Sequence, residues 1–341
     1  MPEALKRALG ELPGGQALPR GLLEGAFAEI LSGEASAPMM AAFLTGLAVR
    51  GETASELVAG ATIMRQHARR HDLGSPLLDT CGTGGLPWKS LNTSTASALV
   101  IAAAGGRVAK HGNRSVPPKT GSADVLEALG VNLDVDDETL RRCVDSAGVG
   151  FMFARTHHSA MRHVAPVRAE LGLRTIFNLL GPLTNPAGAD HQILGVSDVK
   201  WLEPMANALA QLGTRRAWVV HGMDGIDEVS ISGPTRVAAV EDGAVRVFEI
   251  APADAGLTPS PLSSLEGEDV AGNARAILEL LDGQAGPFRN VVCLNAACGL
   301  HILGLAGTLA EGVSRAGAVL DSGAARGTLK ALCALSHGQD A

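Results

Sequence analysis

The stretch that most constrains the fold is residues 77–130, where apolar segments alternate with two polar loops. Apolar residues run into Asp79, and a glycine-rich turn at residues 82–85, an Ala-rich helical pattern and a short strand at 107–109 follow. The second polar loop is residues 110–114. The order strand, turn, helix, strand predicts that both loops lie at the carboxyl ends of parallel strands, where open α/β sheets bind ligands.

The polar residues of this stretch indicate a phosphate-rich ligand. Glycines let backbone N–H groups approach phosphate oxygens, and a helix that begins near Ser94 adds the partial positive charge of its N-terminus. Lys110, Arg114 and Lys119 can supply the charges that a pyrophosphate needs. A Gly-Thr-Gly-Gly turn can also form a tight corner without any ligand. The second polar loop, with several donors and acceptors in a row, favours a binding site.

Several motifs, in this order along the chain, resemble the anthranilate phosphoribosyltransferases of tryptophan biosynthesis. The first are Asp-x-x-Gly-Thr-Gly-Gly at residues 79–85, Asn-x-Ser-Thr at 92–95 and Lys-His-Gly-Asn-Arg at 110–114. Further matches lie at residues 121–124, 163–168, 178–186, 221–222 and 227–228. The resemblance covers nearly the whole chain, which makes it far more specific than a single glycine turn.

The alternation of elements, together with the resemblance, predicts an α/β protein with two domains. We expect a small, mainly helical domain at residues 1–72, joined by about residues 160–190. Residues 73–341 are expected to form a larger domain that binds phosphoribosyl pyrophosphate, with a mostly parallel central sheet flanked by helices.

Helical patterns occupy about the first 70 residues. Residues 22–31 form one apolar stripe, and a second helix is expected between Ser36 and Gly51. Thr53 with Glu56 predicts a capping box at the start of a third helix. The resemblance implies a homodimer that forms through these N-terminal helices.

The pattern of strands and helices continues beyond the central stretch. Strands are expected at residues 149–153, 192–196 and 217–220, a helix at 201–212, and a hairpin near the sheet edge at 236–250. Residues 175–186 are rich in turn formers and predict a rigid loop between the domains.

The resemblance implies a set of substrate contacts. Those for phosphoribosyl pyrophosphate are Gly82, Thr83, Gly84, Gly85, Ser90, Asn92, Thr93, Ser94, Thr95, Lys110, His111, Gly112, Asn113, Arg114 and Ser122. Those for anthranilate are Gly82, His111, Asn113, His158, Arg168 and Pro182. Lys110 and Arg168 are the expected catalytic residues, with Lys110 on the leaving pyrophosphate. Arg168 is expected to pair with the anthranilate carboxylate or to line its entry channel, and His157 is expected to be structural.

Asp227 and Glu228 follow a predicted strand and suggest a metal site. An acidic turn of this kind can be solvated surface. It can also bind Mg²⁺, which is held through one or two carboxylates together with substrate phosphates. The resemblance favours Mg²⁺ at this pair and implies that the Ser94 hydroxyl is a ligand of a second metal position.

Composition excludes several other classes of protein. The five cysteines show no Cys-x-x-Cys spacing, so neither a disulfide framework nor a zinc site is indicated. A net charge of −7 and only 3% aromatic residues argue against nucleic-acid binding. No apolar run reaches the roughly 20 residues that a membrane span needs. The first residues lack a signal-peptide pattern, so we expect a cytoplasmic protein.

Two positions depart from the family pattern. Residues 86–87 are Leu-Pro where Asp-Gly is usual, and residues 117–118 are Pro-Pro where two small residues are usual. Three functions stay open: an active family member with a modified diphosphate site, a paralogous transferase or phosphorylase with another acceptor or donor, and a non-catalytic ligand-binding or nucleic-acid-binding relative. Asn92, Ser94, Lys110 and the acidic pair are all retained, which favours the first.

Overall fold

The computed structural model describes residues 2–114 and 120–340. Its strands are β1 (Leu78–Gly82), β2 (Val108–Gly112), β3 (Val149–Phe153), β4 (His191–Gly195), β5 (Arg216–Gly222), β6 (Thr235–Glu241) and β7 (Ala244–Ile250). Its helices are α1 (Glu3–Glu11), α2 (Arg20–Leu31), α3 (Ala37–Arg50), α4 (Ala54–His67), α5 (Thr93–Ala103), α6 (Ser122–Ala128), α7 (Asp137–Ala147), α8 (Ala154–His157), α9 (Ala165–Leu171), α10 (Phe177–Leu180), α11 (Leu202–Gln211), α12 (Val270–Leu281), α13 (Pro287–Ile302), α14 (Leu309–Asp321) and α15 (Ala324–Ser336).

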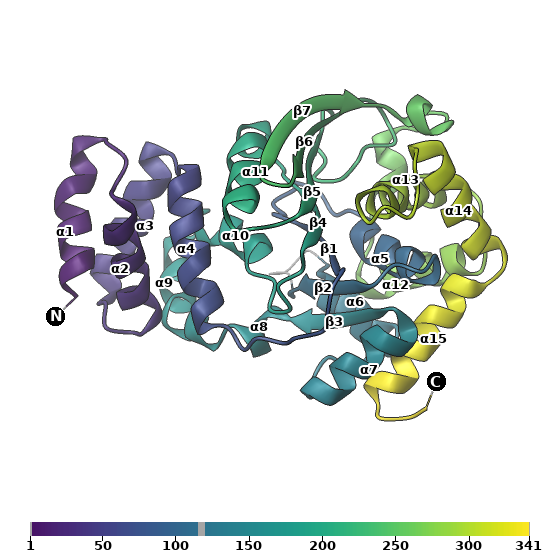
Figure 1. The fold of residues 1–341 in the computed structure, drawn as a ribbon, viewed down its shortest axis with the longest axis horizontal. Helices are drawn as coiled ribbons and strands as arrows, with labels where there is room; N and C mark the ends of the chain where they lie inside the picture. Colours follow the sequence, from purple (N-terminus) through teal and green to yellow (C-terminus); the bar gives the residue numbers. More distant parts are fainter. Residues whose placement is uncertain (1, 115–119, 341) are drawn as a thin grey trace.

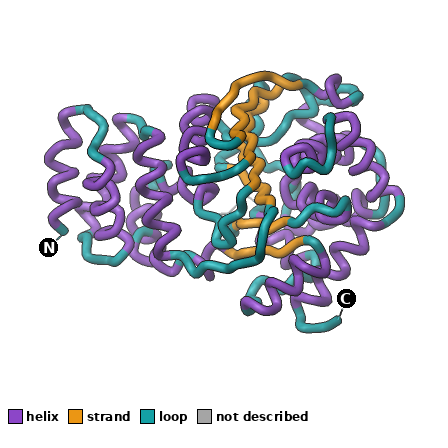
Figure 2. Tube along the Cα trace, in the orientation of Figure 1, coloured by secondary structure: helices purple, strands orange, loops and turns teal. Residues whose placement is uncertain are grey.

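The strands form one sheet in the order β3-β2-β1-β4-β5-β6-β7, which runs between two helical layers (Figure 2). Strands β1 to β5 are parallel, and β6 and β7 add an antiparallel hairpin at one edge. The chain passes from β1 outward to β2 and β3, then returns to β4 on the other side of β1. This reversal opens a crevice at the carboxyl ends of β1 and β4. The predicted α/β fold class is confirmed.

Side chains of the central strands alternate between two apolar clusters. Trp218 and Val220 of β5 belong to the cluster that includes α5 and the C-terminal helices. Ala217 and Val219 belong to the other cluster, which includes α11 and the N-terminal helices. Figure 1 shows these helices on opposite sides of the sheet. Because both faces are covered, the parallel strands are apolar on both sides.

The N-terminal helices pack on a later segment of the chain. Phe27 of α2 makes edge-to-face contacts with Phe43 of α3, at 5.7 Å between ring centroids, and with Phe177 of α10, at 6.2 Å. The capping box of Thr53 and Glu56 is present, as predicted. Helices α1 to α4 lie at the end of the molecule away from the C-terminus (Figure 1). The domain boundaries near residue 72 and residues 160–190 remain a prediction.

Two local predictions were wrong in detail. Residues 175–186 do not form one loop, because α10 and a 3₁₀ turn (Gly181–Leu183) lie within them and bury Leu180 and Leu183. Strand β2 continues to Gly112, since it pairs with β3 along its whole length. Lys110 and His111 are therefore buried strand residues rather than the start of a loop. Across the described residues, no helix is both long and apolar enough to span a membrane.

Candidate active site

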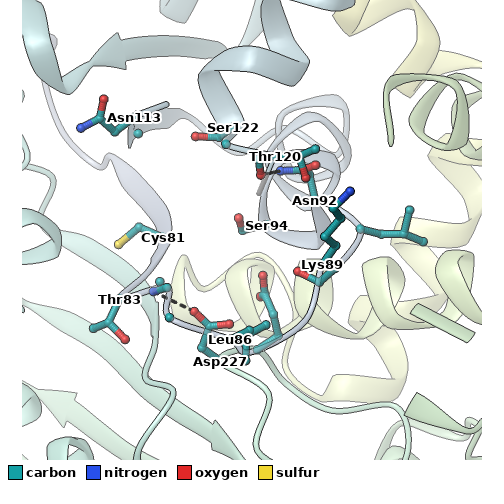
Figure 3. A pocket seen from close by; sticks show the side chains of 18 of the residues that line it. Cys81, Thr83, Leu86, Lys89, Asn92, Ser94, Asn113, Thr120, Ser122 and Asp227 are labelled. Carbon is teal, nitrogen blue, oxygen red and sulfur yellow. Dashed lines mark hydrogen bonds between the residues drawn. The ribbon is translucent and has the colours of Figure 1, made fainter. Parts of the chain in front are cut away.

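Loops that follow adjacent strands meet at the crevice. The glycine turn follows β1, residues 113–114 follow β2, and Asp227 and Glu228 follow β5. These segments surround a cavity of about 330 Å³ (Figure 3). Predicted site residues that line the cavity are Gly82, Thr83, Gly84, Gly85, Ser90, Asn92, Ser94, Lys110, His111, Gly112, Asn113, Arg114, Ser122, Asp227 and Glu228. The fold thus brings motifs from distant parts of the sequence to one cavity.

Thr93, Thr95, His158, Arg168 and Pro182 are not part of this lining. The two threonines are buried in α5, so their side chains face the core. His158 is buried behind His111, with 5.1 Å between the ring centroids. Arg168 lies on α9, and Pro182 lies in the 3₁₀ turn after α10. The last three therefore lie in the segment between β3 and β4, outside the lining.

The glycine turn is held from two sides. Gly84 and Gly85 have φ values of 61° and 97°, in the left-handed region that favours glycine. The Gly84 N–H donates to Oδ2 of Asp227 at 3.0 Å. Arg174 donates to the carbonyl oxygens of Gly84, at 3.1 Å, and Thr83, at 3.4 Å. A Cβ at Gly85 would lie 1.8 Å from Nη1 of Arg174, so glycine also makes room for the guanidinium group.

Lys110 places a cation beside the N-terminus of α5. Its side chain is buried, with Nζ 3.2 Å from Oγ of Ser94 and a hydrogen bond to the carbonyl oxygen of Thr80. Burial lowers the pKa of Lys110, whereas the negative charge of Asp79 raises it. The Asp79 carboxylate is itself fixed, because its Oδ1 accepts the backbone N–H of His111 at 3.0 Å. Lys110 and the helix dipole make this end of the cavity suitable for an anion.

The acidic pair lies on the loop after β5. Burial, and next the charge of Asp227, raise the pKa of Glu228 to about 8. The loop approaches β4 closely, since a Cβ at Gly195 would lie 1.7 Å from the backbone oxygen of Asp227. From the other side, the Asn295 side chain of α13 donates to the carbonyl oxygen of Val229 at 2.9 Å and accepts its N–H at 3.0 Å. The position of the pair is therefore fixed by packing on both sides.

The residues of this loop fit Mg²⁺. Within the described ranges, no cluster of three or more His, Cys, Asp or Glu side chains could hold a metal ion. Mg²⁺ does not need one, because it keeps several waters and is held by one or two carboxylates together with substrate phosphates. Because burial and the charge of Asp227 raise the pKa of Glu228, a bound cation would favour the ionised form of this pair. The backbone of Ser94 also hydrogen-bonds Glu228, which brings all three predicted ligands together.

Neutral imidazole groups lie behind the polar loop. The Nε2 atoms of His111 and His158 are buried and have no hydrogen-bond partner in the part of the chain that the structure describes. Burial lowers the pKa of both rings, that of His158 to about 4. Both are therefore neutral near pH 7 and can each offer one donor or one acceptor. His157 instead hydrogen-bonds His71 at 3.0 Å, away from the cavity lining.

Two predicted cations differ in their surroundings. Nε of Arg168 is buried and has no partner among the described residues. Burial, and next the charge of Arg174, lower the pKa of Arg168. Arg114 instead forms ion pairs with Asp124 and Glu127 of α6, each at 2.8 Å. Arg168 can therefore pair with an incoming anion, whereas carboxylates of the protein already hold Arg114.

The first departure from the family pattern has a structural role. Leu86 is buried in the apolar cluster on the α5 side of the sheet, where Trp88 also packs. Burial of a leucine side chain stabilises a fold by roughly 1.5–3 kcal/mol. Leu86 thus anchors the turn from the core, in place of the usual aspartate. The second departure, Pro117 with Pro118, and the predicted cation Lys119 lie outside the described residues.

The sequence motifs missed several residues that shape the site. Trp88, Lys89 and Thr120 line the cavity, and Lys89 and Thr120 are labelled on its wall in Figure 3. Arg174 holds the glycine turn, and Asn273 of α12 contacts the loop before α5. The sequence signal for Asn273 is weak, because it is a single polar residue within an amphipathic helix pattern.

The chain matches two family models. The helical bundle domain of a glycosyl transferase family matches residues 6–68, and the a/b domain of the glycosyl transferase family matches residues 74–326. The anthranilate phosphoribosyltransferase of Hyphomonas neptunium is 62% identical over 337 residues, which cover 99% of each chain.

Solved structures show the same similarity. The crystal structure of anthranilate phosphoribosyltransferase from Thermus thermophilus has a TM-score of 0.91 at 44% identity and covers 97% of this chain and 99% of its own. The Saccharomyces cerevisiae enzyme in complex with phosphoribosyl pyrophosphate and Mg has a TM-score of 0.89 at 27% identity, over 98% of each chain. The yeast enzyme in complex with 4-fluoroanthranilate has a TM-score of 0.88 at 26% identity, over 99% of each chain. The chain belongs to the anthranilate phosphoribosyltransferase family.

Proposed function

We propose that the protein transfers the 5-phosphoribosyl group of phosphoribosyl pyrophosphate to the amine of anthranilate, in tryptophan biosynthesis. The bond between ribose C1 and the pyrophosphate oxygen breaks, a bond from C1 to nitrogen forms, and the amine loses a proton. The observation that carries the proposal is the meeting of the glycine turn, Lys110 and the acidic pair at one cavity. The names of the family relatives support the same reaction.

The pyrophosphate end of the donor needs groups that stabilise the negative charge that grows on the leaving oxygens. We assign this end to the glycine turn, the N-terminus of α5 and Lys110. The ammonium group of Lys110 is already held by Thr80 and Ser94, so it need not reorganise during the reaction. The start of α5 adds the partial positive charge of a helix N-terminus, which favours an anion.

The anthranilate end needs positioning rather than a strong base, because an aromatic amine is already a usable nucleophile. We assign anthranilate to the side of the cavity near His111 and Asn113, bordered by His158, Arg168 and Pro182. Arg168 pairs with the carboxylate of anthranilate in this proposal. The buried polar atoms of Arg168, His111 and His158 that lack partners among the described residues support it, since a ligand would satisfy them.

Magnesium is the proposed cofactor. Asp227 and Glu228 would hold one ion, and the Ser94 hydroxyl would be a ligand of a second, each together with oxygens of the donor. When bound, Mg²⁺ supplies positive charge to the pyrophosphate oxygens. The proposal is supported by the fit of these three residues and by the structure of the yeast enzyme, which is in complex with phosphoribosyl pyrophosphate and Mg.

A homodimer that forms through α3 is also part of the proposal. The sequence of α3 contains no charged residue before Arg50, and Val49 on this helix is 83% exposed. An exposed apolar helix face of this kind is typical of a protein interface. Light scattering on the wild type and on Val49→Glu tests it: a dimer that the substitution dissociates supports the interface, and a monomeric wild type contradicts it. We place the reaction in the cytoplasm, which cell fractionation can test.

The loss of anthranilate fluorescence on addition of phosphoribosyl pyrophosphate tests the activity. We expect turnover that depends on Mg²⁺ and disappears in the double variant Asp227→Ala/Glu228→Ala. The matched control is Glu249→Ala, which removes an exposed carboxylate from β7 and should keep wild-type turnover. Folded wild-type protein that shows no turnover at saturating donor contradicts the proposed reaction and directs the search to other acceptors.

A further inference from the structure

Asn273 on α12 connects two loops of the site. Its side chain is fully buried. Its Nδ2 lies 2.9 Å from the carbonyl oxygen of Ser90, 2.9 Å from Oδ1 of Asn92 and 2.9 Å from Oγ1 of Thr120. Its Oδ1 accepts the backbone N–H of Glu268 at 3.1 Å. One amide group therefore holds the end of the loop after β1 and the end of the loop after β2.

The backbone segment before α12 also contacts the loop that leads into α5. Ser90 forms an isolated antiparallel bridge with Glu266, and Gly267 donates to the carbonyl oxygen of Lys89 at 3.0 Å. A Cβ at Gly267 would lie 2.6 Å from the carbonyl oxygen of Ser90 and 2.7 Å from Oδ1 of Asn273. The segment before α12 is thus packed directly against the loop that leads into α5.

Asn92 is oriented by this network. It occupies the N-cap position of α5, but its side chain does not cap the helix. Its Oδ1 accepts from Asn273, and its Nδ2 faces the carbonyl oxygen of Thr120 at 3.4 Å, as Figure 3 shows for the pair Asn92 and Thr120. The opposite orientation of the Asn92 amide would place two NH₂ groups against each other. Asn273 therefore fixes which group Asn92 presents to the cavity.

This arrangement keeps the Asn92 side chain away from the first N–H groups of α5. An asparagine at an N-cap normally accepts an N–H group of the first turn. Because Asn273 and Thr120 hold the Asn92 side chain instead, that side chain does not occupy the N-terminus of α5, where the pyrophosphate is assigned.

We propose that Asn273 is a positioning residue for phosphoribosyl transfer, which sets the spacing of the two donor-binding loops through Asn92 and Thr120. The inference rests on the proposed function. Asn273 does not line the cavity, and it acts on the donor side, away from His111, His158 and Arg168. Its loss should therefore weaken donor binding and leave acceptor binding nearly unchanged.

The test uses Asn273→Asp and Asn273→Ala in the full chain. The aspartate keeps the size and one acceptor oxygen but removes both donor hydrogens, and it faces oxygens of Ser90 and Asn92. Two or three lost hydrogen bonds correspond to a rise in KM for phosphoribosyl pyrophosphate of about tenfold to a hundredfold. The KM for anthranilate should stay within about twofold of the wild type.

Asn132→Ala is the matched control. The Asn132 side chain also bridges two segments, since it donates to the carbonyl oxygen of Ser336 at 3.1 Å and accepts the N–H of Asp134 at 3.1 Å, and it does not line the cavity. We expect this variant to lose stability without any change in either KM. Gly267→Ala, whose added Cβ would lie 2.6 Å from the carbonyl oxygen of Ser90 and 2.7 Å from Oδ1 of Asn273, disturbs the same contact from a residue outside the cavity lining and keeps the proposal testable if both Asn273 variants unfold. It should raise the KM for the donor in the same direction.

Equal rises of both KM values, or an unchanged donor KM in folded Asn273 variants, would overturn the proposal. Direct binding separates this result from a failure of the proposed function. Calorimetric titration with phosphoribosyl pyrophosphate and Mg²⁺ measures the Kd without any acceptor. If the wild type binds the donor but does not turn over anthranilate, the proposed function fails. The ratio of the Kd values of Asn273→Asp and wild type then still decides the role of Asn273.

Discussion

The backbone N–H of Gly84 donates a hydrogen bond to Oδ2 of Asp227 at 3.0 Å, which links two loops that lie 143 residues apart in the sequence. The first loop is assigned to the leaving pyrophosphate, and the second supplies carboxylates expected to bind the metal. A carboxylate that accepts a backbone N–H also keeps a defined orientation. The two halves of the candidate site are therefore aligned before any substrate binds.

Gly195→Ala should disrupt this alignment. The added Cβ would lie 1.7 Å from the backbone oxygen of Asp227, so the acidic loop must move away from β4. Overpacking of this kind costs about 1–3 kcal/mol of stability. We expect lower stability and at least about a tenfold higher Mg²⁺ requirement, measured by chemical denaturation and by metal titration of turnover.

Gly233→Ala is the control for this substitution, because no atom lies within 4 Å of its added Cβ. It should behave as the wild type in both measurements. A Gly195→Ala protein with wild-type metal dependence would show that the acidic loop does not need its close contact with β4.

Arg174→Ala should loosen the glycine turn. Arg174 is exposed, and its guanidinium group donates to the carbonyl oxygens of Gly84 and Thr83. Loss of these hydrogen bonds corresponds to about 0.5–1.5 kcal/mol each, and we expect about a tenfold higher KM for the donor. Arg174→Lys should restore only part of the loss, since an ammonium group lacks the planar fork that reaches two acceptors. Steady-state kinetics of both variants check this, and full recovery by lysine would contradict it.

The sequence predicted much of the fold because local patterns and tertiary packing agree. The capping box of Thr53 and Glu56 and the strand Val149–Phe153 are formed by residues whose own preferences favour these structures. Strand β2 was predicted too short because Lys110 and His111 are polar, and only pairing with β3 shows that they are in a strand. Leu180 was assigned to a loop because the adjacent Gly-Pro dipeptide suggests a turn. In the structure its side chain is buried and it forms the last residue of α10.

Motifs identified residues that face the candidate cavity, but not the residues that hold them in place. Asn92 and Asp227 belong to recognisable motifs and line the cavity. Asn273 and Asn295 lie on helices near the C-terminus, and each holds a loop by side-chain hydrogen bonds to backbone atoms. Such contacts depend on the three-dimensional packing of distant segments, and a single buried polar residue in a helix pattern does not reveal its partner.

Lys110→Met should lower both activity and stability. The lysine is buried, and its hydrogen bonds to Thr80 and Ser94 offset the cost of removing a cation from water. Methionine fills a similar volume but leaves the buried Asp79 carboxylate without its cation, so we expect the unfolding free energy to fall by about 3–5 kcal/mol. The kcat should fall by about 10²–10³, since the positive charge that stabilises the leaving pyrophosphate is lost. Activity within tenfold of the wild type would contradict the assigned role of Lys110.

The buried histidines should make the fold sensitive to acid. Burial, and next the charge of His71, lower the pKa of His157 to about 4, and burial lowers that of His158 to about 4. An unfolded chain has histidine pKa values near 6.5, so between about pH 6.5 and pH 4 the unfolded state binds more protons than the native state. The contribution of the two neutral rings to the free energy of unfolding is therefore fully present above about pH 6.5. It falls as the pH decreases toward 4, by about 1.4 kcal/mol per pH unit for each ring and by several kcal/mol for both together.

His157→Gln isolates one of these groups. Glutamine can still pair with Nε2 of His71, which lies 3.0 Å from Nδ1 of His157, but it does not titrate. We expect chemical denaturation between pH 4.5 and pH 8 to show that the unfolding free energy falls less steeply with decreasing pH than in the wild type. The difference in slope should correspond to about one proton. His337→Gln, which removes an exposed imidazole group near the C-terminus, is the matched control and should keep the wild-type slope. Parallel pH profiles for His157→Gln and wild type would show that His157 is protonated equally in the native and unfolded states.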